Sequence, residues 1–212
     1  MLRSVRNPIL GCLASALLLG PVAVLSYKVS PTLELDRSIQ NHFTAHDAGA
    51  AHAISTWFAH LVDPLPFIVL LAGIVLVGVA IGRTRETAAA VAVVAGATLS
   101  TQVLKVLMPW AWAFPSGHTT AAASLAVALV LIAPPRLRPP AAALGAALVA
   151  FTGTSVIVLG WHFPGDVLGG LLVVASWTFA AIAALRLLRP RGPSTPRGEV
   201  RSSSGRFAIS LP

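Results

Sequence analysis

One histidine follows three residues that favour the start of a helix. His118 comes directly after Pro115, Ser116 and Gly117 and before the apolar run of residues 119–133. The start of a helix offers unpaired backbone N–H groups and the positive end of the helix dipole, which together bind anions. A histidine beside such a site can donate a proton to a leaving oxygen. A capped helix with an interfacial histidine is the simpler interpretation, and the order of the four residues weakens it.

A second histidine, His162, stands four residues before Asp166 at the start of another apolar stretch. A carboxylate at this spacing can hydrogen-bond one imidazole nitrogen and leave the other basic enough to attack phosphorus. A polar pair that caps a helix is the alternative. Lys105 adds a cation, although a lysine near a helix end is commonly a snorkelling side chain. Together these residues are the parts that phosphoryl transfer through a phosphohistidine requires.

The composition decides what kind of protein must position these groups. The chain has 212 residues, of which 56% are hydrophobic and only 10% are charged, and its mean hydropathy is +0.80. A water-soluble domain of this size carries about 25% charged residues. So few charges exclude a soluble enzyme and predict an integral membrane protein. The single cysteine excludes a disulfide framework and a cysteine-based metal cluster.

Six stretches of the chain contain no Asp, Glu, Lys or Arg. They cover residues 7–27, 64–82, 87–104, 106–135, 139–165 and 167–185. A helix needs about 20 mostly apolar residues to cross the hydrocarbon core, so each stretch can hold one span. Their richness in Ala, Leu, Val and Gly is typical of helices that pack against helices in lipid. The sequence therefore predicts an all-α, integral membrane six-helix bundle.

The basic residues between these stretches fall on one side of the membrane. That side has the arginines at positions 3, 6, 83, 85, 136 and 138 and all those from 186 onward, whereas the opposite side has only Lys28, Arg37 and Lys105. By the positive-inside rule, both termini are cytoplasmic. We therefore expect a multi-pass protein of the plasma (inner) membrane with its active site on the extracytoplasmic face. The net charge of +8 then needs no nucleic-acid partner.

Residues 1–187 are predicted to form one membrane domain, and residues 188–212 a basic, disordered cytoplasmic tail near anionic headgroups. In the outer loop of residues 28–63, apolar side chains recur at helical spacing between polar residues. This pattern is typical of amphipathic helices in the membrane interface, which serve either as a simple connector or as a rim that guides a lipid headgroup. A cleaved leader is the alternative for residues 7–27, and its removal would leave five spans.

Two segments resemble signature motifs of a known family. Residues 115–118 (PSGH) and residues 155–166 (SVIVLGWHFPGD) are similar to the second and third motifs of the type 2 phosphatidic acid phosphatase (PAP2) and haloperoxidase superfamily. The resemblance implies six membrane helices and activity on lipid phosphates. The catalytic roles it implies are nucleophile for His162, orienting acid for Asp166 and leaving-group acid for His118. The phosphate-binding residues it implies are Lys105, Ser116 and Gly117.

Two arginines of the family's motifs are absent from this chain. The first motif reads lysine, six residues, arginine-proline, and here Trp112 and Ala113 occupy the last two positions. The third motif has arginine after its serine, where this chain has Val156. In the family both arginines clamp the phosphate, and a charge-assisted hydrogen bond contributes about 1.5–3 kcal/mol. Losing two is expected to lower the rate by on the order of 10²–10⁴.

The favoured hypothesis is an extracytoplasmic lipid-phosphate phosphatase acting on a polyprenyl diphosphate, phosphatidic acid or a related lipid phosphate. No cofactor or metal is expected, because Lys105 and the helix start supply positive charge and Asp166 is taken as the sole carboxylate near the two histidines. The expected partners are the lipid substrate and membrane lipids, without nucleic acid. The alternative is a catalytically impaired relative that binds lipid headgroups or a membrane partner. A transporter is disfavoured, because the ionisable residues lie at the outer span ends rather than near the midplane.

Overall fold

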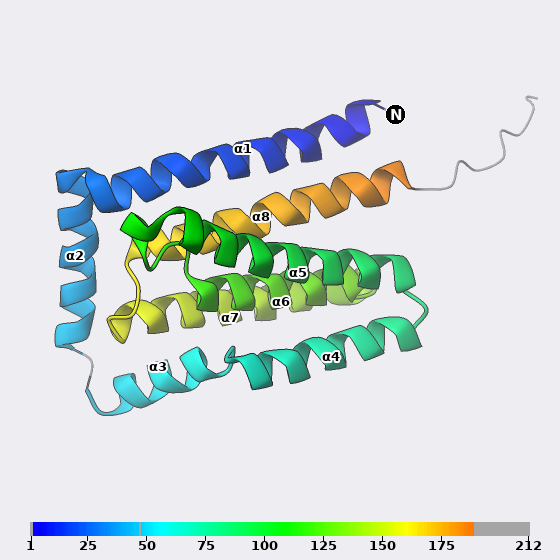
Figure 1. Ribbon diagram of the computed structural model, residues 1–212. Helices are drawn as coiled ribbons and strands as arrows, with labels where there is room; N and C mark the ends of the chain where they lie inside the picture. Colours follow the sequence, from blue (N-terminus) through cyan, green and yellow to red (C-terminus); the bar gives the residue numbers. More distant parts are fainter. Residues whose placement is uncertain (1, 47, 189–212) are drawn as a thin grey trace, which may run out of the picture.

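The computed structural model describes residues 2–46 and 48–188, and the regular elements in them are all helices (Figure 1). The α-helices are α1 (Leu2–Lys28), α2 (Ser30–Ala45), α3 (Ala50–His60), α4 (Pro64–Ala80), α5 (Thr84–Leu107), α6 (Gly117–Ile132), α7 (Arg138–Val158) and α8 (Pro164–Leu187). Two short 3-10 helices, η1 (Pro109–Ala111) and η2 (Pro135–Leu137), precede α6 and α7. Each of the six charge-free stretches thus contains one long helix.

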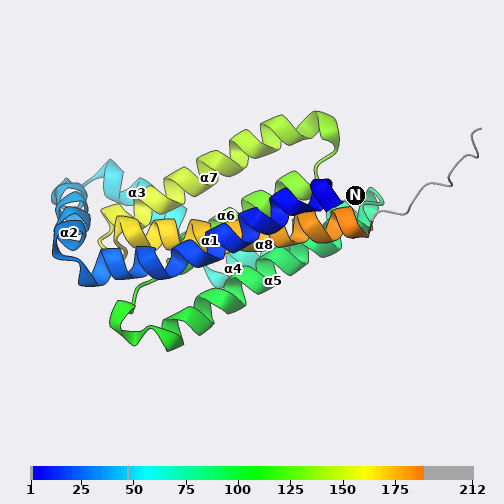
Figure 2. The same ribbon diagram turned by 90° about the horizontal axis from the view of Figure 1, so that it is seen from above.

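The longer helices run alongside one another, and α2 lies across one end of the bundle (Figures 1 and 2). Helix α8 packs against α1, α5 and α6, whereas α7 packs against α6 and α3. Because α8 has neighbouring helices on several sides, it lies at the centre of the bundle. The first helix, α1, packs extensively along α8 and so forms part of the bundle.

Small residues allow the helices to approach closely. Gly145 on α7 faces Ala126 on α6 so closely that an added Cβ would lie 2.7 Å from the Ala126 Cβ atom. The main core cluster includes Val93, Ala97 and Val173, from α5 and α8. Large apolar side chains such as Leu17 and Leu76 are exposed on the outside of the bundle. Helices that are apolar on all sides are typical of membrane spans.

The structure supports a multi-pass membrane protein, with fewer full-length spans than predicted. Among the described residues, four helices are long and apolar enough to cross a membrane: Val5–Lys28, Thr84–Leu107, Pro135–Val158 and Pro164–Leu187. Helices α3 and α4 make a fifth if they form one span bent by 59°. Helix α6 has 16 residues, about 24 Å of length, because its first turn starts only after the loop that carries Ser116. The six-span count remains a prediction.

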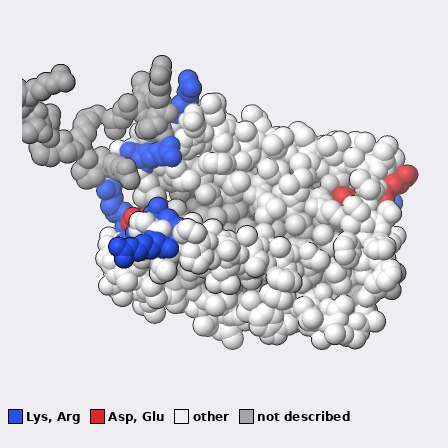
Figure 3. All heavy atoms as spheres, turned by 180° about the vertical axis from the view of Figure 1, so that it is seen from behind, with Lys and Arg blue, Asp and Glu red and all other residues white. Residues whose placement is uncertain are grey.

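The predicted outer loop contains two helices, α2 and α3, so the helical pattern in residues 28–63 is confirmed. Their position in the membrane interface remains a prediction. On the face in Figure 3, Lys and Arg gather at the end of the bundle where α1 begins and α8 ends, while the opposite end shows mainly acidic groups. This asymmetry agrees with the charge pattern of the loops. The tail of residues 189–212 lies outside the described residues.

Candidate active site

Asp166 lies in the first turn of α8, and His162 lies in the loop just before the helix. The backbone N–H of Phe163 donates to Oδ2 of Asp166 at 2.9 Å, which caps the helix start. The Nδ1 atom of His162 lies 3.3 Å from the same oxygen. Asp166 is fully buried and His162 is 9% exposed. A buried carboxylate on Nδ1 favours the tautomer that leaves Nε2 unprotonated, which is the form that a nucleophile requires.

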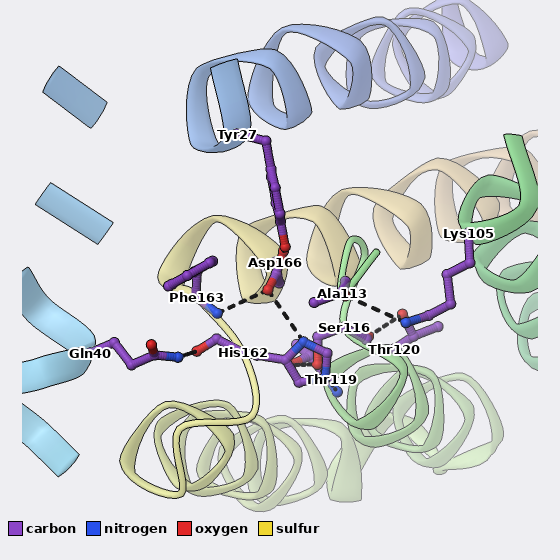
Figure 4. Close-up of polar contacts among 10 residues, drawn as sticks. All are labelled: Tyr27, Gln40, Lys105, Ala113, Ser116, Thr119, Thr120, His162, Phe163 and Asp166. Atoms are coloured by element: carbon purple, nitrogen blue, oxygen red, sulfur yellow. Dashed lines mark hydrogen bonds and ion pairs between the residues drawn. The ribbon is translucent and has the colours of Figure 1, made fainter. Parts of the chain in front are cut away.

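Two further residues, Tyr27 and Gln40, form hydrogen bonds with this pair, and the sequence alone did not indicate them (Figure 4). The Tyr27 hydroxyl, at the end of α1, donates to Oδ1 of Asp166 at 2.7 Å. The Gln40 side-chain amide, on α2, donates to the backbone carbonyl of His162 at 3.0 Å. These partners are 139 and 122 residues apart in the chain. Sequence spacing carries no signal for contacts of this kind, because they depend on how α1 and α2 dock against α8.

The start of α6 lies against the start of α8. Ser116 is the N-cap residue of α6, and its Oγ atom accepts from the Thr119 backbone N–H at 3.3 Å. The backbone N–H of Ser116 donates to the carbonyl of Asp166 at 2.9 Å, which ties the two helix starts together. Gly170, one turn along α8, permits this approach, because a Cβ there would lie 2.9 Å from the Ser116 carbonyl oxygen. The predicted helix start at residues 115–118 is therefore present, and Gly117 is its first residue.

His118 faces His162 across the site, and the ring centroids are 6.2 Å apart. The Nε2 atom of His118 also lies 3.7 Å from Oδ1 of Asp63, in the turn between α3 and α4. The other oxygen of Asp63 is 2.6 Å from Nδ1 of His60. The expectation that Asp166 is the sole carboxylate near the two histidines is therefore wrong. The bend between α3 and α4 brings Asp63 back over α6, and its place directly before a proline-initiated helix was the signal available.

Lys105 extends from the last turn of α5 toward the loop that leads to Ser116 (Figure 4). Its Nζ atom donates to the backbone carbonyl of Ala113 at 3.4 Å, and the side chain is partly buried. Its charge lies close enough to interact with both Asp166 and His118. Helices α5 and α6 and the loop before α8 thus bring an ammonium and two imidazoles to one end of the bundle.

A cleft of about 400 Å³ lies beside His118, between α4, α5 and α6. Its polar lining residues include Asp63, Thr101, His118 and Thr120, and its apolar ones include Phe67 and Ile68. This combination suits a ligand with a charged head and an apolar tail. No group of three or more His, Cys, Asp and Glu side chains within residues 2–46 and 48–188 is arranged to hold a metal ion.

The two positions where the family motifs have arginine differ in their surroundings. Trp112, at the end of η1, is 69% exposed. Val156, on α7, is fully buried, and its carbonyl accepts from the backbone N–H groups of Trp161 and His162 at 2.9 and 3.1 Å. Val156 therefore supports the turn that presents His162, although its side chain adds no charge.

Comparison with known proteins relates this geometry to a family. Residues 92–189 match the family model of the PAP2 superfamily. Phosphatidylglycerophosphatase B of Escherichia coli and that of Shigella flexneri are each 41% identical to this chain over 90 residues, or 42% of this chain. The match spans about a third (34%) of the length of those relatives.

The fold also matches a solved structure of a membrane protein. A transmembrane PAP2 type phosphatidylglycerolphosphate phosphatase from Bacillus subtilis superimposes with a TM-score of 0.68 at 20% identity. The match covers 84% of this chain and 98% of that one. It extends the similarity in fold well beyond the residues that match the family model. The segment of residues 92–189, which contains Lys105 and both histidines of the site, is thus similar to the PAP2 superfamily in sequence.

Proposed function

We propose that this protein is a lipid-phosphate phosphatase whose nucleophile is His162 and whose general acid is His118. The observation that supports it most strongly is the meeting of Lys105, His118 and the His162–Asp166 pair at one end of the bundle, from three separate parts of the chain. The PAP2 match and the phosphatidylglycerophosphatase relatives support the same reaction class.

In the first step, Nε2 of His162 forms a bond to phosphorus while the bond from phosphorus to the leaving oxygen breaks. Asp166 accepts a hydrogen bond from Nδ1 and stabilises the positive charge that develops on the ring. The leaving oxygen takes its proton from His118. Lys105 and the N-terminus of α6 stabilise the negative charge on the other phosphate oxygens.

In the second step, a water molecule attacks the phosphohistidine. The water gives its proton to the now neutral His118, and the bond between Nε2 and phosphorus breaks. His162 regains its unprotonated Nε2 and inorganic phosphate leaves. His118 ends the cycle protonated, so the two steps balance without any external acid.

The substrate class we propose is a lipid phosphate: phosphatidylglycerol phosphate, phosphatidic acid or a polyprenyl diphosphate. The apolar wall of the cleft beside His118 suits the lipid part, and the site residues suit the phosphate. The names of the relatives favour phosphatidylglycerol phosphate within this class. We also propose six spans with both termini in the cytoplasm, which puts the site on the extracytoplasmic face of the plasma (inner) membrane.

The second candidate function is lipid-headgroup binding by a catalytically impaired protein. The observation that favours it is the absence of both motif arginines, at the positions of Trp112 and Val156. In addition, the Oγ atom of Ser116 already accepts two hydrogen bonds, from the backbone N–H and the hydroxyl of Thr119. Such a protein would bind lipid phosphates but release no phosphate from them.

The deciding experiment measures phosphate release from these lipid phosphates by the purified protein in mixed micelles. The wild type is compared with His162→Ala and with His42→Ala, whose side chain is exposed on α2 and packs against Phe43 and His46. We expect activity in the wild type and in the His42 variant, and its loss in the His162 variant. Equal release by the wild type and the His162 variant on every substrate would refute the phosphatase.

The orientation has its own test, in a Cys12→Ser background that removes the single native cysteine. New cysteines are placed at Leu35 on α2 and Leu137 on η2, which are both exposed and lie at opposite ends of the bundle. A membrane-impermeant maleimide should label the first in intact cells and the second only after permeabilisation. The reverse pattern would contradict an extracytoplasmic site.

A further inference from the structure

The carboxylate of Asp166 is buried completely and depends on a small set of hydrogen-bond donors. Its Oδ2 atom receives the Phe163 backbone N–H and the His162 ring. Its Oδ1 atom receives the Tyr27 hydroxyl, at 2.7 Å, the shortest of these contacts. Among the described residues, His162 is the one basic side chain that forms an ion pair with this carboxylate. A buried anion with an unpaired oxygen is costly, so the donor on Oδ1 is important.

The Tyr27 ring is held in place by aromatic neighbours on both sides of the site. It packs edge-on against Phe163, with ring centroids 5.9 Å apart, and against Trp110, with centroids 6.5 Å apart. Phe163 is also the residue whose backbone N–H donates to Oδ2 of Asp166. These two ring contacts favour the orientation of the Tyr27 side chain that places its hydroxyl on Oδ1 of Asp166.

We infer that Tyr27 is a positioning residue: its hydroxyl locks the Asp166 carboxylate in the orientation that fixes the tautomer of His162. This inference rests on the proposed function, in which His162 attacks through Nε2. Tyr27 lies on α1, outside residues 92–189 that match the family model. Helix α1 thus completes the site although it contains none of the motif residues. Its close packing along α8 is what brings Tyr27 to Asp166.

Without the hydroxyl, Oδ1 of Asp166 is left buried and unpaired. The carboxylate is then expected to rotate or to take up a proton, and Nδ1 of His162 loses its fixed acceptor. A mixture of tautomers follows, in which part of the population carries its proton on Nε2 and cannot attack. We expect this effect to lower kcat and to leave KM unchanged, because the Tyr27 hydroxyl donates to Asp166 and to none of Lys105, Ser116 and Gly117 in the described structure.

The test compares Tyr27→Phe, which removes only the hydroxyl, with Trp110→Phe as the matched control. Trp110 contacts the same Tyr27 ring and has no contact with Asp166 in the described structure. For Tyr27→Phe we expect kcat to fall about 10- to 100-fold with KM unchanged. The control should keep both constants. Thermal unfolding in detergent checks that both variants are folded.

A spectroscopic measurement makes the test independent of turnover. In protein labelled with ¹⁵N-histidine, the imidazole shifts report the tautomer of His162, assigned by its loss in His162→Ala. We expect the Nδ1–H form in the wild type and a growing Nε2–H form in Tyr27→Phe, as in Asp166→Asn. A wild type that releases no phosphate would contradict the proposed function. In that case the change of His162 tautomer between wild type and Tyr27→Phe still tests whether Tyr27 positions Asp166.

Three results would overturn the inference. The first is a wild-type kcat in Tyr27→Phe. The second is a loss of kcat with an unchanged His162 tautomer, which would indicate a structural role for the ring. The third is an equal loss in Trp110→Phe, because this control keeps the hydroxyl.

Discussion

The Nε2 atom of His118 lies 3.7 Å from Oδ1 of Asp63, which joins the start of α6 to the turn before α4. Asp63 holds His60 with its other oxygen, at 2.6 Å. Burial disfavours a positive charge on the His118 imidazole most strongly, and the nearby His162, His60 and Lys105 disfavour it further. An anion at this distance favours the protonated imidazole that a general acid must be. Asp63 therefore opposes the effects of burial and of these basic neighbours on His118.

We expect Asp63→Asn to lower kcat about 10-fold with little change in KM, because fewer molecules carry the acidic proton on His118. Phosphate release from a lipid phosphate in mixed micelles measures the effect. The matched variant is His60→Gln, which leaves the Asp63 charge in place and alters an exposed side chain. It should retain most of the activity. A wild-type kcat in Asp63→Asn would show that His118 keeps its proton without this carboxylate.

Asp36, on α2, predicts a dependence of stability on pH. Burial raises the pKa of Asp36 above its ordinary value of 3.8; the hydrogen bond from Ser26 opposes this rise and the Asp166 charge adds to it. The folded state thus holds the proton more tightly than the unfolded chain. Its contribution to stability is fully present below pH 3.8 and is lost as the pH rises through the raised value. We expect Asp36→Asn to raise the unfolding midpoint at pH 7 by roughly 2–4 °C.

The measurement is thermal unfolding in detergent at pH 7 and at pH 4.5. The gain in midpoint from Asp36→Asn should shrink at the lower pH, where a larger share of the native carboxyl is protonated because its pKa is raised. Glu34→Gln is the control, because Glu34 is exposed on the same helix and carries the same charge. It should change neither midpoint. A larger gain at pH 4.5 than at pH 7 would be incompatible with a raised pKa of Asp36.

Much of the fold was predictable from where charges are absent. Each stretch without charged residues became a long helix, because a chain in lipid must satisfy its backbone hydrogen bonds internally. The number of full spans was harder to predict. Helix length depends on where the loop before Gly117 ends and on the bend between α3 and α4, and neither feature leaves a hydropathy signal.

The local parts of the site were also predictable, and the long-range parts were not. The contact of His162 with Asp166 follows from their spacing of four residues across the start of α8, and the Ser116 cap follows from its position before Gly117. By contrast, Tyr27 reaches Asp166 only because α1 docks along α8. Asp63 reaches His118 only because the chain bends before α4. Such contacts are set by tertiary packing, which one sequence read alone does not reveal.

Gly170 provides a test of how closely the two helix starts must lie. An added Cβ at Gly170 would lie 2.9 Å from the Ser116 carbonyl oxygen and 3.1 Å from the Thr119 Cβ atom. We therefore expect Gly170→Ala to push α6 away from α8, to destabilise the fold by about 1–3 kcal/mol and to reduce phosphate release. Gly73→Ala, on α4, is the control, because a Cβ there meets nothing within 4 Å. Equal midpoints and activities for both variants would mean that α6 can move freely.

We expect opposite results when arginine is introduced at Val156 and at Trp112, the two positions where the family motifs have arginine. Val156 is fully buried on α7, so Val156→Arg must insert a charged side chain into a closed space. We expect it to destabilise the protein by about 3 kcal/mol or more and to abolish activity through unfolding. The measurement is the unfolding midpoint in detergent. A stable, active Val156→Arg variant would show that α7 can open beside His162.

Trp112 offers the converse case, because its side chain is 69% exposed and an arginine there needs no new space. Its neighbour Ala113 accepts the hydrogen bond from Lys105, so a guanidinium at position 112 starts beside the proposed phosphate site. One more charge-assisted hydrogen bond to phosphate contributes about 1.5–3 kcal/mol, and we expect Trp112→Arg to raise kcat/KM at least about 10-fold. Trp112→Gln removes the same ring without adding charge and should give no gain. If both variants behave alike, this position does not face the phosphate, and the missing arginine does not limit the rate.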